Sequence, residues 1–140
     1  MGTYVGHTSI TVSDFDRSVD FYTNVMGLHM SVDFGLMPAD FLTRQEGAMN
    51  RFCLLADDEG HQCVEIFEFS NVEQRRFEGK AQHQDFWSSH VCFLYDDIDA
   101  AYQRVVDAGT EIDIPLTEAE GWKFAYVYDP DGYLVELVAK

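Results

Sequence analysis

Basic residues are scarce in this chain of 140 residues, which carries 9 Lys and Arg against 25 Asp and Glu and so has a formal net charge of −16 at pH 7. A charge of this size sets up a negative field that repels phosphate backbones and anionic lipid headgroups. We therefore expect no nucleic-acid partner and no membrane partner.

Long apolar runs are also missing. No stretch approaches the ~18 consecutive apolar residues of a membrane-spanning helix, and the N-terminus lacks the basic and hydrophobic blocks of a secretory signal. We expect a cytoplasmic protein. The overall composition, 46% hydrophobic and 24% charged, is ordinary for a globular protein, so we expect one compact domain.

Cysteine is too rare, and wrongly spaced, for a disulfide framework or a zinc-thiolate site. The three residues, Cys53, Cys63 and Cys92, are odd in number and form no C-x-x-C pair. Each lies within a strand-like run. We expect three buried, reduced thiols.

The chain opens with a strand pattern followed by a helix pattern. Residues 5–12 alternate as a strand. The next apolar residues recur at i, i+4, i+7 and i+11, which predicts a helix that Ser13 or Asp14 caps and Gly27 ends. This stripe consists of Phe15, Val19, Tyr22 and Met26.

The rest of the first half predicts three more strands. Residues 30–34 alternate as a strand, and residues 36–50 are expected to form an irregular loop. Residues 51–56 and 62–69 then form two arms about the acidic turn at 57–60. The first half is therefore βαβββ.

The same order begins again after a polar connector at residues 71–84. Residues 87–95 predict a strand around His90, and the helix that follows is capped by Asp97 or Asp96 and ended by Gly109. Its apolar stripe consists of Ile98, Ala101, Tyr102 and Val105.

The second half closes with a short strand at residues 112–116 and a β-hairpin at 122–138. We expect an α+β fold of two tandem βαβββ modules, residues 1–70 and 85–140, in a single domain. Their strands are expected to form a curved, mostly antiparallel sheet around one cavity, with the helices outside.

The two halves repeat the position of a histidine. His7 precedes Asp14 by seven residues, and His90 precedes Asp97 by seven residues. Both histidines lie on the first strand of their half. His29, His61 and His83 fall at a helix exit, a turn and the connector, so we expect them to be surface residues.

The two halves also repeat the position of a glutamate on the last strand. Gly60 precedes Glu65 by five residues, and Gly132 precedes Glu136 by four. Leu and Val surround Glu136, and burying a lone carboxylate costs several kcal/mol unless it is paired or bound to a metal. These acids therefore need partners.

His7, Glu65, His90 and Glu136 together offer two imidazoles and two carboxylates. Such a set suits one divalent ion, such as Zn, Ni, Co, Mn or Fe. An ion at this site would stabilise an enediolate or activate a water molecule, and a carboxylate could act as a base.

Three segments resemble the vicinal oxygen chelate superfamily. They are H-T-S-I-T-V-S-D-F-D-R-S-V-D-F-Y from His7, with Gly27; His90 with D-I-D-A-A from Asp97; and D-P-D-G-Y-L-V-E, which ends at Glu136. The superfamily includes glyoxalase I, methylmalonyl-CoA epimerase, extradiol ring-cleaving dioxygenases, and the fosfomycin and bleomycin resistance proteins. The resemblance covers nearly the whole chain.

The resemblance implies metal ligands at His7, Glu65, His90 and Glu136, and an acid at Glu65 is similar to glyoxalase I. It favours a lyase or isomerase of glyoxalase type that moves a proton next to a carbonyl, with Glu65 or Glu136 as the base. Two alternatives stay open. They are a metal-free binding protein of bleomycin-resistance type and an iron(II) ring-cleaving dioxygenase.

Side chains that alternate with the glutamates predict an aromatic, mostly apolar pocket for a small oxygenated molecule. Its expected members are Phe67, Phe69, Trp122, Phe124, Tyr126, Leu134 and Val138. Arg44, Arg51 and Lys123 are the basic residues best placed to meet an anionic group.

The resemblance and the exposed strand edges expected of this architecture imply a homodimer. Whether one chain supplies all four ligands, or two chains supply a pair each, is left open by the sequence.

Overall fold

The computed structural model describes residues 2–76 and 79–140, so Met1 and the connector residues 77–78 lie outside the described part. The chain divides into two compact units, Met1–Arg75 and Arg76–Lys140. This division falls within the predicted connector. No helix in the described residues is both long and apolar enough to cross a membrane.

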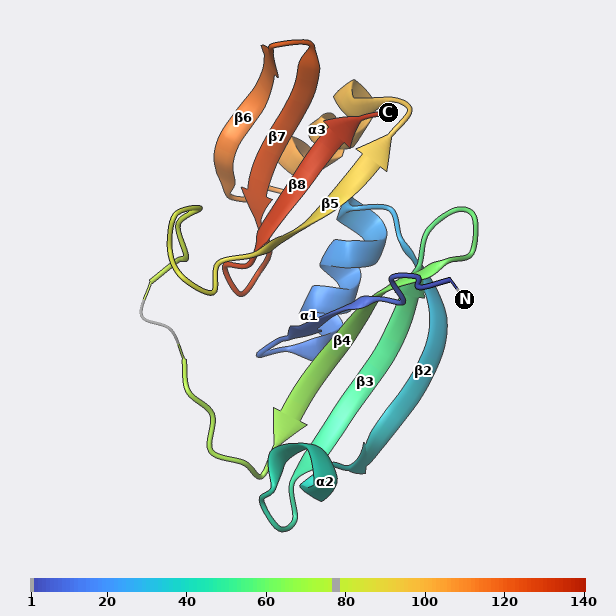
Figure 1. The fold of residues 1–140 in the computed structure, drawn as a ribbon, viewed down its shortest axis with the longest axis vertical. Helices are drawn as coiled ribbons and strands as arrows, with labels where there is room; N and C mark the ends of the chain where they lie inside the picture. The colour runs from blue at the N-terminus through green and yellow to red at the C-terminus, as the bar shows by residue number, and fades with distance from the viewer. Residues whose placement is uncertain (1, 77–78) are drawn as a thin grey trace. The chain divides into compact units, whose positions relative to one another are not determined.

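The first unit is a four-stranded mixed sheet (Figure 1). Its helices follow β1 and β2 in the sequence. The strands lie in the order β1-β4-β3-β2, with β1 parallel to β4 and the other pairs antiparallel. The elements are β1 (Thr8–Thr11), α1 (Phe15–Asp20), η1 (Phe21–Val25), β2 (His29–Pro38), α2 (Asp40–Thr43), β3 (Met49–Ala56) and β4 (Gln62–Ser70).

The second unit repeats this topology. Its strand order is β5-β8-β7-β6, and the parallel pair is again the first strand with the last. The elements are β5 (His90–Tyr95), α3 (Ile98–Asp107), β6 (Ile112–Ala119), β7 (Trp122–Tyr128) and β8 (Leu134–Ala139). The predicted α+β fold of two βαβββ modules with mostly antiparallel strands is confirmed.

Matching aspartates start the two main helices. The Asp14 carboxylate accepts a 3.0 Å hydrogen bond from the backbone N–H of Arg17, and Asp97 accepts one of 2.9 Å from Ala100. Each bond satisfies an N–H that has no partner within the helix. The sequence offered Ser13 or Asp14 as the cap of the first helix and Asp97 or Asp96 as the cap of the second. The structure uses Asp14 and Asp97.

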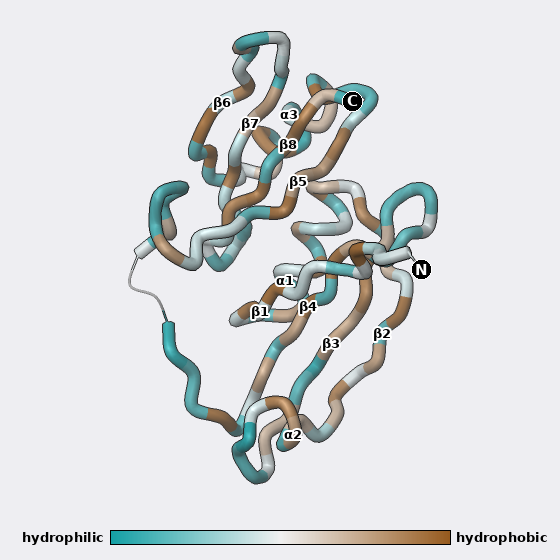
Figure 2. Tube along the Cα trace, viewed as in Figure 1, coloured by the Kyte–Doolittle hydropathy of each residue, from teal (hydrophilic) through white to brown (hydrophobic). Residues whose placement is uncertain are grey.

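Each glutamate of the repeat lies between two fully buried residues of its strand. In β4, Val64 and Ile66 are fully buried, whereas Glu65 between them points to the other face. In β8, Val135 and Leu137 are fully buried on either side of Glu136. Figure 2 shows the hydrophobic residues along these strands and the hydrophilic ones in the turn between β3 and β4.

The helix of each unit covers this buried face. The backbone N–H of Phe15, at the start of α1, donates to Glu68, which shares its face of β4 with Val64 and Ile66. Asp99 of α3 likewise binds Lys123, which shares its face of β7 with Ala125. Glu65 and Glu136 therefore point away from their own unit's helix.

The predicted first helix changes its hydrogen-bond pattern at Phe21. The backbone N–H of Met26 donates to the Phe21 carbonyl, five residues back, which defines the π-helix η1. Of the predicted apolar stripe, Phe15, Tyr22 and Met26 are buried and Val19 is half-buried.

The prediction of an irregular loop at residues 36–50 is wrong at both ends of this segment. Strand β2 continues to Pro38, the short helix α2 follows, and β3 begins at Met49, which pairs with Pro38. Two β-bulges in β2, between Met30 and Val32 and between Asp33 and Gly35, break the alternation on which the prediction depended. Strand β6 also runs beyond its predicted end, to Ala119.

Candidate functional site

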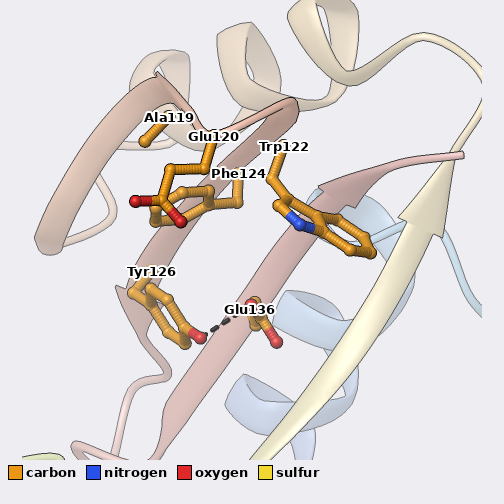
Figure 3. A pocket seen from close by; sticks show the side chains of 6 residues that line it. All are labelled: Ala119, Glu120, Trp122, Phe124, Tyr126 and Glu136. Carbon is orange, nitrogen blue, oxygen red and sulfur yellow. Dashed lines mark hydrogen bonds between the residues drawn. The ribbon is translucent and has the colours of Figure 1, made fainter.

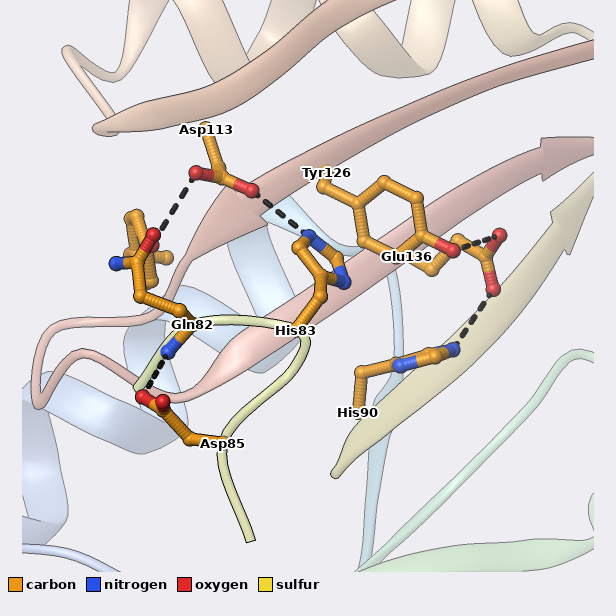
Figure 4. Close-up of polar contacts among 8 residues, drawn as sticks. Gln82, His83, Asp85, His90, Asp113, Tyr126 and Glu136 are labelled. Carbon is orange, nitrogen blue, oxygen red and sulfur yellow. Dashed lines mark hydrogen bonds and ion pairs between the residues drawn. The ribbon is translucent and has the colours of Figure 1, made fainter. Parts of the chain in front are cut away.

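A histidine and a tyrosine hold the carboxylate of Glu136 (Figure 4). Nε2 of His90, the first residue of β5, lies 3.1 Å from Oε2 of Glu136. The hydroxyl of Tyr126, directly opposite on β7, donates a 2.6 Å hydrogen bond to Oε1. The Glu136 side chain is only 17% exposed, and these two partners account for its burial.

The first unit contains the matching pair. Nε2 of His7, which directly precedes β1, lies 3.3 Å from Oε2 of Glu65, whose side chain is 14% exposed. Here the residue opposite on β3 is Leu54, in the place that Tyr126 holds in the second unit. The two pairs share a position in the fold and differ in their cross-strand neighbours. Ser9 and Leu54 flank Glu65, whereas Cys92 and Tyr126 flank Glu136.

The geometry within each pair fits two donors to a common metal ion. With bonds of about 2.1 Å to imidazole nitrogen and carboxylate oxygen, adjacent donors lie roughly 3.0 Å apart at 90° and roughly 3.4 Å apart at the tetrahedral angle. The observed separations of 3.1 and 3.3 Å lie within this range. The same distances also fit an ion pair between a protonated imidazole and a carboxylate.

Neither pair belongs to a larger cluster of ligands inside its own unit. Within the described residues of each unit, His, Cys, Asp and Glu form no group of three or more able to hold a metal ion. Each unit therefore supplies one nitrogen and one carboxylate.

A pocket of about 350 Å³ lies in the second unit beside Glu136 (Figure 3). Its lining consists of Ala119, Glu120, Trp122, Phe124, Tyr126 and Glu136. Three of the predicted pocket residues are thus brought together, because Trp122, Phe124 and Tyr126 alternate on one face of β7. The predicted members Leu134 and Val138 are buried on β8 and are not part of this lining.

The other two predicted pocket residues belong to a row of aromatic rings in the first unit. Phe67 lies 5.5 Å from Phe69 and 5.6 Å from Phe52, and Phe52 stacks on Phe34 at 4.4 Å between ring centroids. Phe67 and Phe69 share their face of β4 with Glu65. Sequence reasoning missed Phe34 and Phe52, because pairing Phe52 with Phe67 requires the strand register.

Two of the three candidate anion-binding residues are already paired on the helix side of their sheets. The Arg51 guanidinium lies 3.0 Å from Asp16 and packs over the ring of Phe15. Lys123 bonds to both oxygens of Asp99, and this contact raises the pKa of its ammonium group. Arg44, the third, is exposed at the end of α2.

His83 is exposed, as expected for a residue in the connector, and it also contacts the site. Its Nε2 lies 2.9 Å from Oδ2 of Asp113, and its ring meets the Tyr126 ring edge-on with centroids 4.6 Å apart. Figure 4 shows His83 between Asp113 and Tyr126. Burial, together with the bond to Glu136, raises the pKa of the Tyr126 hydroxyl, so Tyr126 stays a hydrogen-bond donor.

The cysteines are free thiols, as predicted, but only Cys53 is fully buried. Cys63 is half-buried and Cys92 is exposed, so the prediction of burial is wrong for Cys92. The reason is that Cys92 lies on the edge strand β5 opposite Glu136, on the face away from α3. Partial burial and the Glu136 charge raise the pKa of its thiol to about 11.

Curated proteins similar to this chain include several lactoylglutathione lyases. The enzyme of Pseudomonas aeruginosa is 30% identical, with 94% of this chain and 80% of that protein covered. The enzyme of Schizosaccharomyces pombe is 27% identical over the whole chain, which spans about half (49%) of that longer protein.

Solved structures share the fold at lower identity. A glyoxalase family protein from Bacillus cereus has a TM-score of 0.82 at 19% identity, with 96% of this chain and 92% of that one covered. The fosfomycin resistance protein FosX of Listeria monocytogenes has a TM-score of 0.66 at 18% identity, with 100% and 95% covered.

The match to a known family extends over residues 4–137, which is nearly the whole chain. The resemblance in the three sequence segments, the two βαβββ modules and this match all agree. The chain belongs to the Glyoxalase/Bleomycin resistance protein/Dioxygenase superfamily.

Proposed function

We propose that this protein is a divalent-metal-dependent enzyme of glyoxalase type, an isomerase or lyase that moves a proton next to a carbonyl of a small oxygenated molecule. The observation that carries this proposal is the His–Glu pair at the same place in each module. Membership of the superfamily and the similarity to lactoylglutathione lyases support it.

In this proposal His7, Glu65, His90 and Glu136 bind one ion, which is Zn, Ni, Co, Mn or Fe. The donor separations of 3.3 and 3.1 Å support it, as does the borderline character of an N2O2 donor set. The two pairs come from one chain, or from two chains of a homodimer. The bound ion would act as a Lewis acid on the substrate oxygen and so make the neighbouring C–H more acidic.

The two carboxylates take different roles. Tyr126 and His90 occupy both oxygens of Glu136, so this side chain is held in one orientation and suits a permanent ligand. In the described part of the chain, Glu65 has His7 as its polar partner at Oε2 and faces Leu54 across the strand. We assign Oε1 of Glu65 as the atom that accepts the substrate proton.

The aromatic residues beside the glutamates bind the apolar part of the substrate and limit the access of water. Trp122, Phe124 and Tyr126 supply this wall in the second unit. Excluding water strengthens the electrostatic interactions of the acids and of the ion with the substrate.

Elemental analysis of protein purified without chelator tests the proposal, with Glu136→Gln as the comparison. We expect one divalent ion per chain in the wild type and at least a tenfold lower content in the variant. Metal-dependent exchange of a substrate C–H with solvent deuterium, lost in Glu65→Gln, would support the assigned base. Negligible metal in both proteins would contradict the proposal.

A metal-free binding protein is the second candidate, and one observation favours it. In each pair the imidazole nitrogen lies 3.3 or 3.1 Å from the carboxylate, so the acid has a polar partner without a metal. Tight binding of a small molecule by metal-free protein, with no turnover, would support this candidate. Oxygen uptake with a catechol and iron(II) would instead indicate ring cleavage.

A further inference from the structure

The pocket beside Glu136 combines aromatic rings with negative charge. Three of its six lining residues are aromatic, two are the acids Glu120 and Glu136, and none of these lining residues is basic. Glu136 is held by Tyr126 and His90, so Glu120 is the acid left to meet a ligand. Figure 3 shows its carboxylate directed from the turn toward Phe124 and Tyr126.

The basic residue that is nearest in sequence to the lining aromatic residues points away from this pocket. Lys123 lies between Trp122 and Phe124 in β7, and adjacent residues of a strand face opposite sides of the sheet. Its ammonium group bonds to Asp99 of α3 at 2.8 and 2.6 Å. None of the six lining residues would therefore offer a positive charge to an anionic group in the pocket.

Glu120 occupies a backbone position that disfavours it. Ala119 pairs with Trp122, so Glu120 and Gly121 form a two-residue hairpin loop, and both have positive φ, 51° and 85°. Turns of this kind favour Asn or Gly at the first position, and a residue with a longer side chain is strained there. A strained acid at the mouth of a pocket points to a role in ligand binding.

We propose that this pocket binds an organic cation that also carries an aromatic or similar flat apolar group. The cation would lie near Glu120 and the rings of Trp122 and Phe124, where attraction to the ring faces adds to attraction to the carboxylate. The net charge of −16 would also raise the local concentration of such a ligand. This inference rests on the proposed function, because it names the substrate class of that site.

Three benzyl compounds that differ in charge test the proposal, namely benzyltrimethylammonium, benzyl methyl sulfone and phenylmethanesulfonate. The chain has two tryptophans, so a Trp87→Phe background leaves Trp122 as the only indole reporter. We expect quenching of Trp122 fluorescence to give the tightest binding for the cation and the weakest for the sulfonate. Equal or tighter binding of the sulfonate would overturn the proposal.

Glu120→Asn is the decisive variant, with Glu118→Asn as its matched control. Both remove one negative charge, but Glu118 pairs with Lys123 on the other face and does not line the pocket. We expect Glu120→Asn to weaken binding of the cation about fivefold while the melting temperature stays the same or rises, because Asn suits the turn. An equal loss of affinity for the cation in both variants would show that only the net charge of the protein matters. That result would overturn the proposal.

The ring contribution is tested by Phe124→Leu in the same background, for which we expect about threefold weaker binding of the cation. An unchanged affinity would contradict a role for this ring. These titrations need neither metal nor turnover, so a protein found to lack metal would refute the proposed function and leave the assignment of the pocket standing.

Discussion

The hydroxyl of Tyr126 donates a 2.6 Å hydrogen bond to Oε1 of Glu136, its direct neighbour across the β7–β8 pair. The equivalent acid, Glu65, has Leu54 in this place. The two halves of the internal repeat thus differ at this position, because a tyrosine hydroxyl binds the Glu136 carboxylate whereas an apolar side chain faces Glu65.

Replacing Tyr126 by Phe removes this bond and leaves the ring in place. We expect metal affinity to fall about tenfold, because a ligand that loses its orienting partner binds less well. The free energy of unfolding should fall by about 1 kcal/mol, since the carboxylate is only partly buried. Metal titration and urea unfolding check these values, and Tyr102→Phe on α3 controls for loss of a hydroxyl. Unchanged metal affinity in Tyr126→Phe would show that the bond has no orienting role.

The turns before Glu65 and Glu136 are built on aspartates with different burial. Asp129 is 4% exposed and accepts backbone hydrogen bonds from Asp131 and Tyr133, whereas the side chain of Asp57, which accepts bonds from Glu59 and His61, is 41% exposed.

We therefore expect Asp129→Ala to lower the free energy of unfolding by roughly 2 kcal/mol, because two part-buried N–H groups lose their acceptor. Asp57→Ala should lower it less, since water can replace the lost carboxylate. Urea unfolding of both variants checks the order, and a larger loss for Asp57→Ala would contradict it.

Burial raises the pKa of the Cys53 thiol from 9.0 to about 11. The folded state therefore holds the proton more tightly than the unfolded chain, so this contribution to stability is full below pH 9 and is lost as the pH rises toward 11. One such group lowers the free energy of unfolding by roughly 1.4 kcal/mol per pH unit in this window.

Cys53→Ala should flatten this decline, although the variant is less stable at neutral pH because it loses buried volume. Urea unfolding at pH 8, 9, 10 and 11 gives the two slopes. Part of the decline should persist, because the pKa of Cys92 is also raised to about 11. Parallel slopes for the wild type and the variant would show that Cys53 does not titrate in this window.

Local patterns were enough to predict the repeated fold. The capping aspartates Asp14 and Asp97 and the turn glycines Gly60 and Gly132 act over a few residues, so the sequence alone indicates them. The β-bulges in β2 and the π-helix at 21–25 were missed, because each inserts a residue into a regular period.

Local spacing also predicted part of the candidate site. Spacing indicates His7, Glu65, His90 and Glu136, and the structure pairs them within each unit. The bond from Tyr126 to Glu136 depends on the register of the hairpin, and the contact of His83 with Asp113 spans 30 residues. Such long-range contacts have no periodic pattern in the sequence.

In the proposed function, both His–Glu pairs hold one ion. Titration of metal-free protein with Co(II), followed by its visible absorption, tests this in the wild type and in His7→Gln, Glu65→Gln, His90→Gln and Glu136→Gln. We predict saturation at one ion per chain and at least tenfold weaker binding in all four variants. Wild-type binding in the His7 and Glu65 variants, or no binding by any protein, would contradict the shared site.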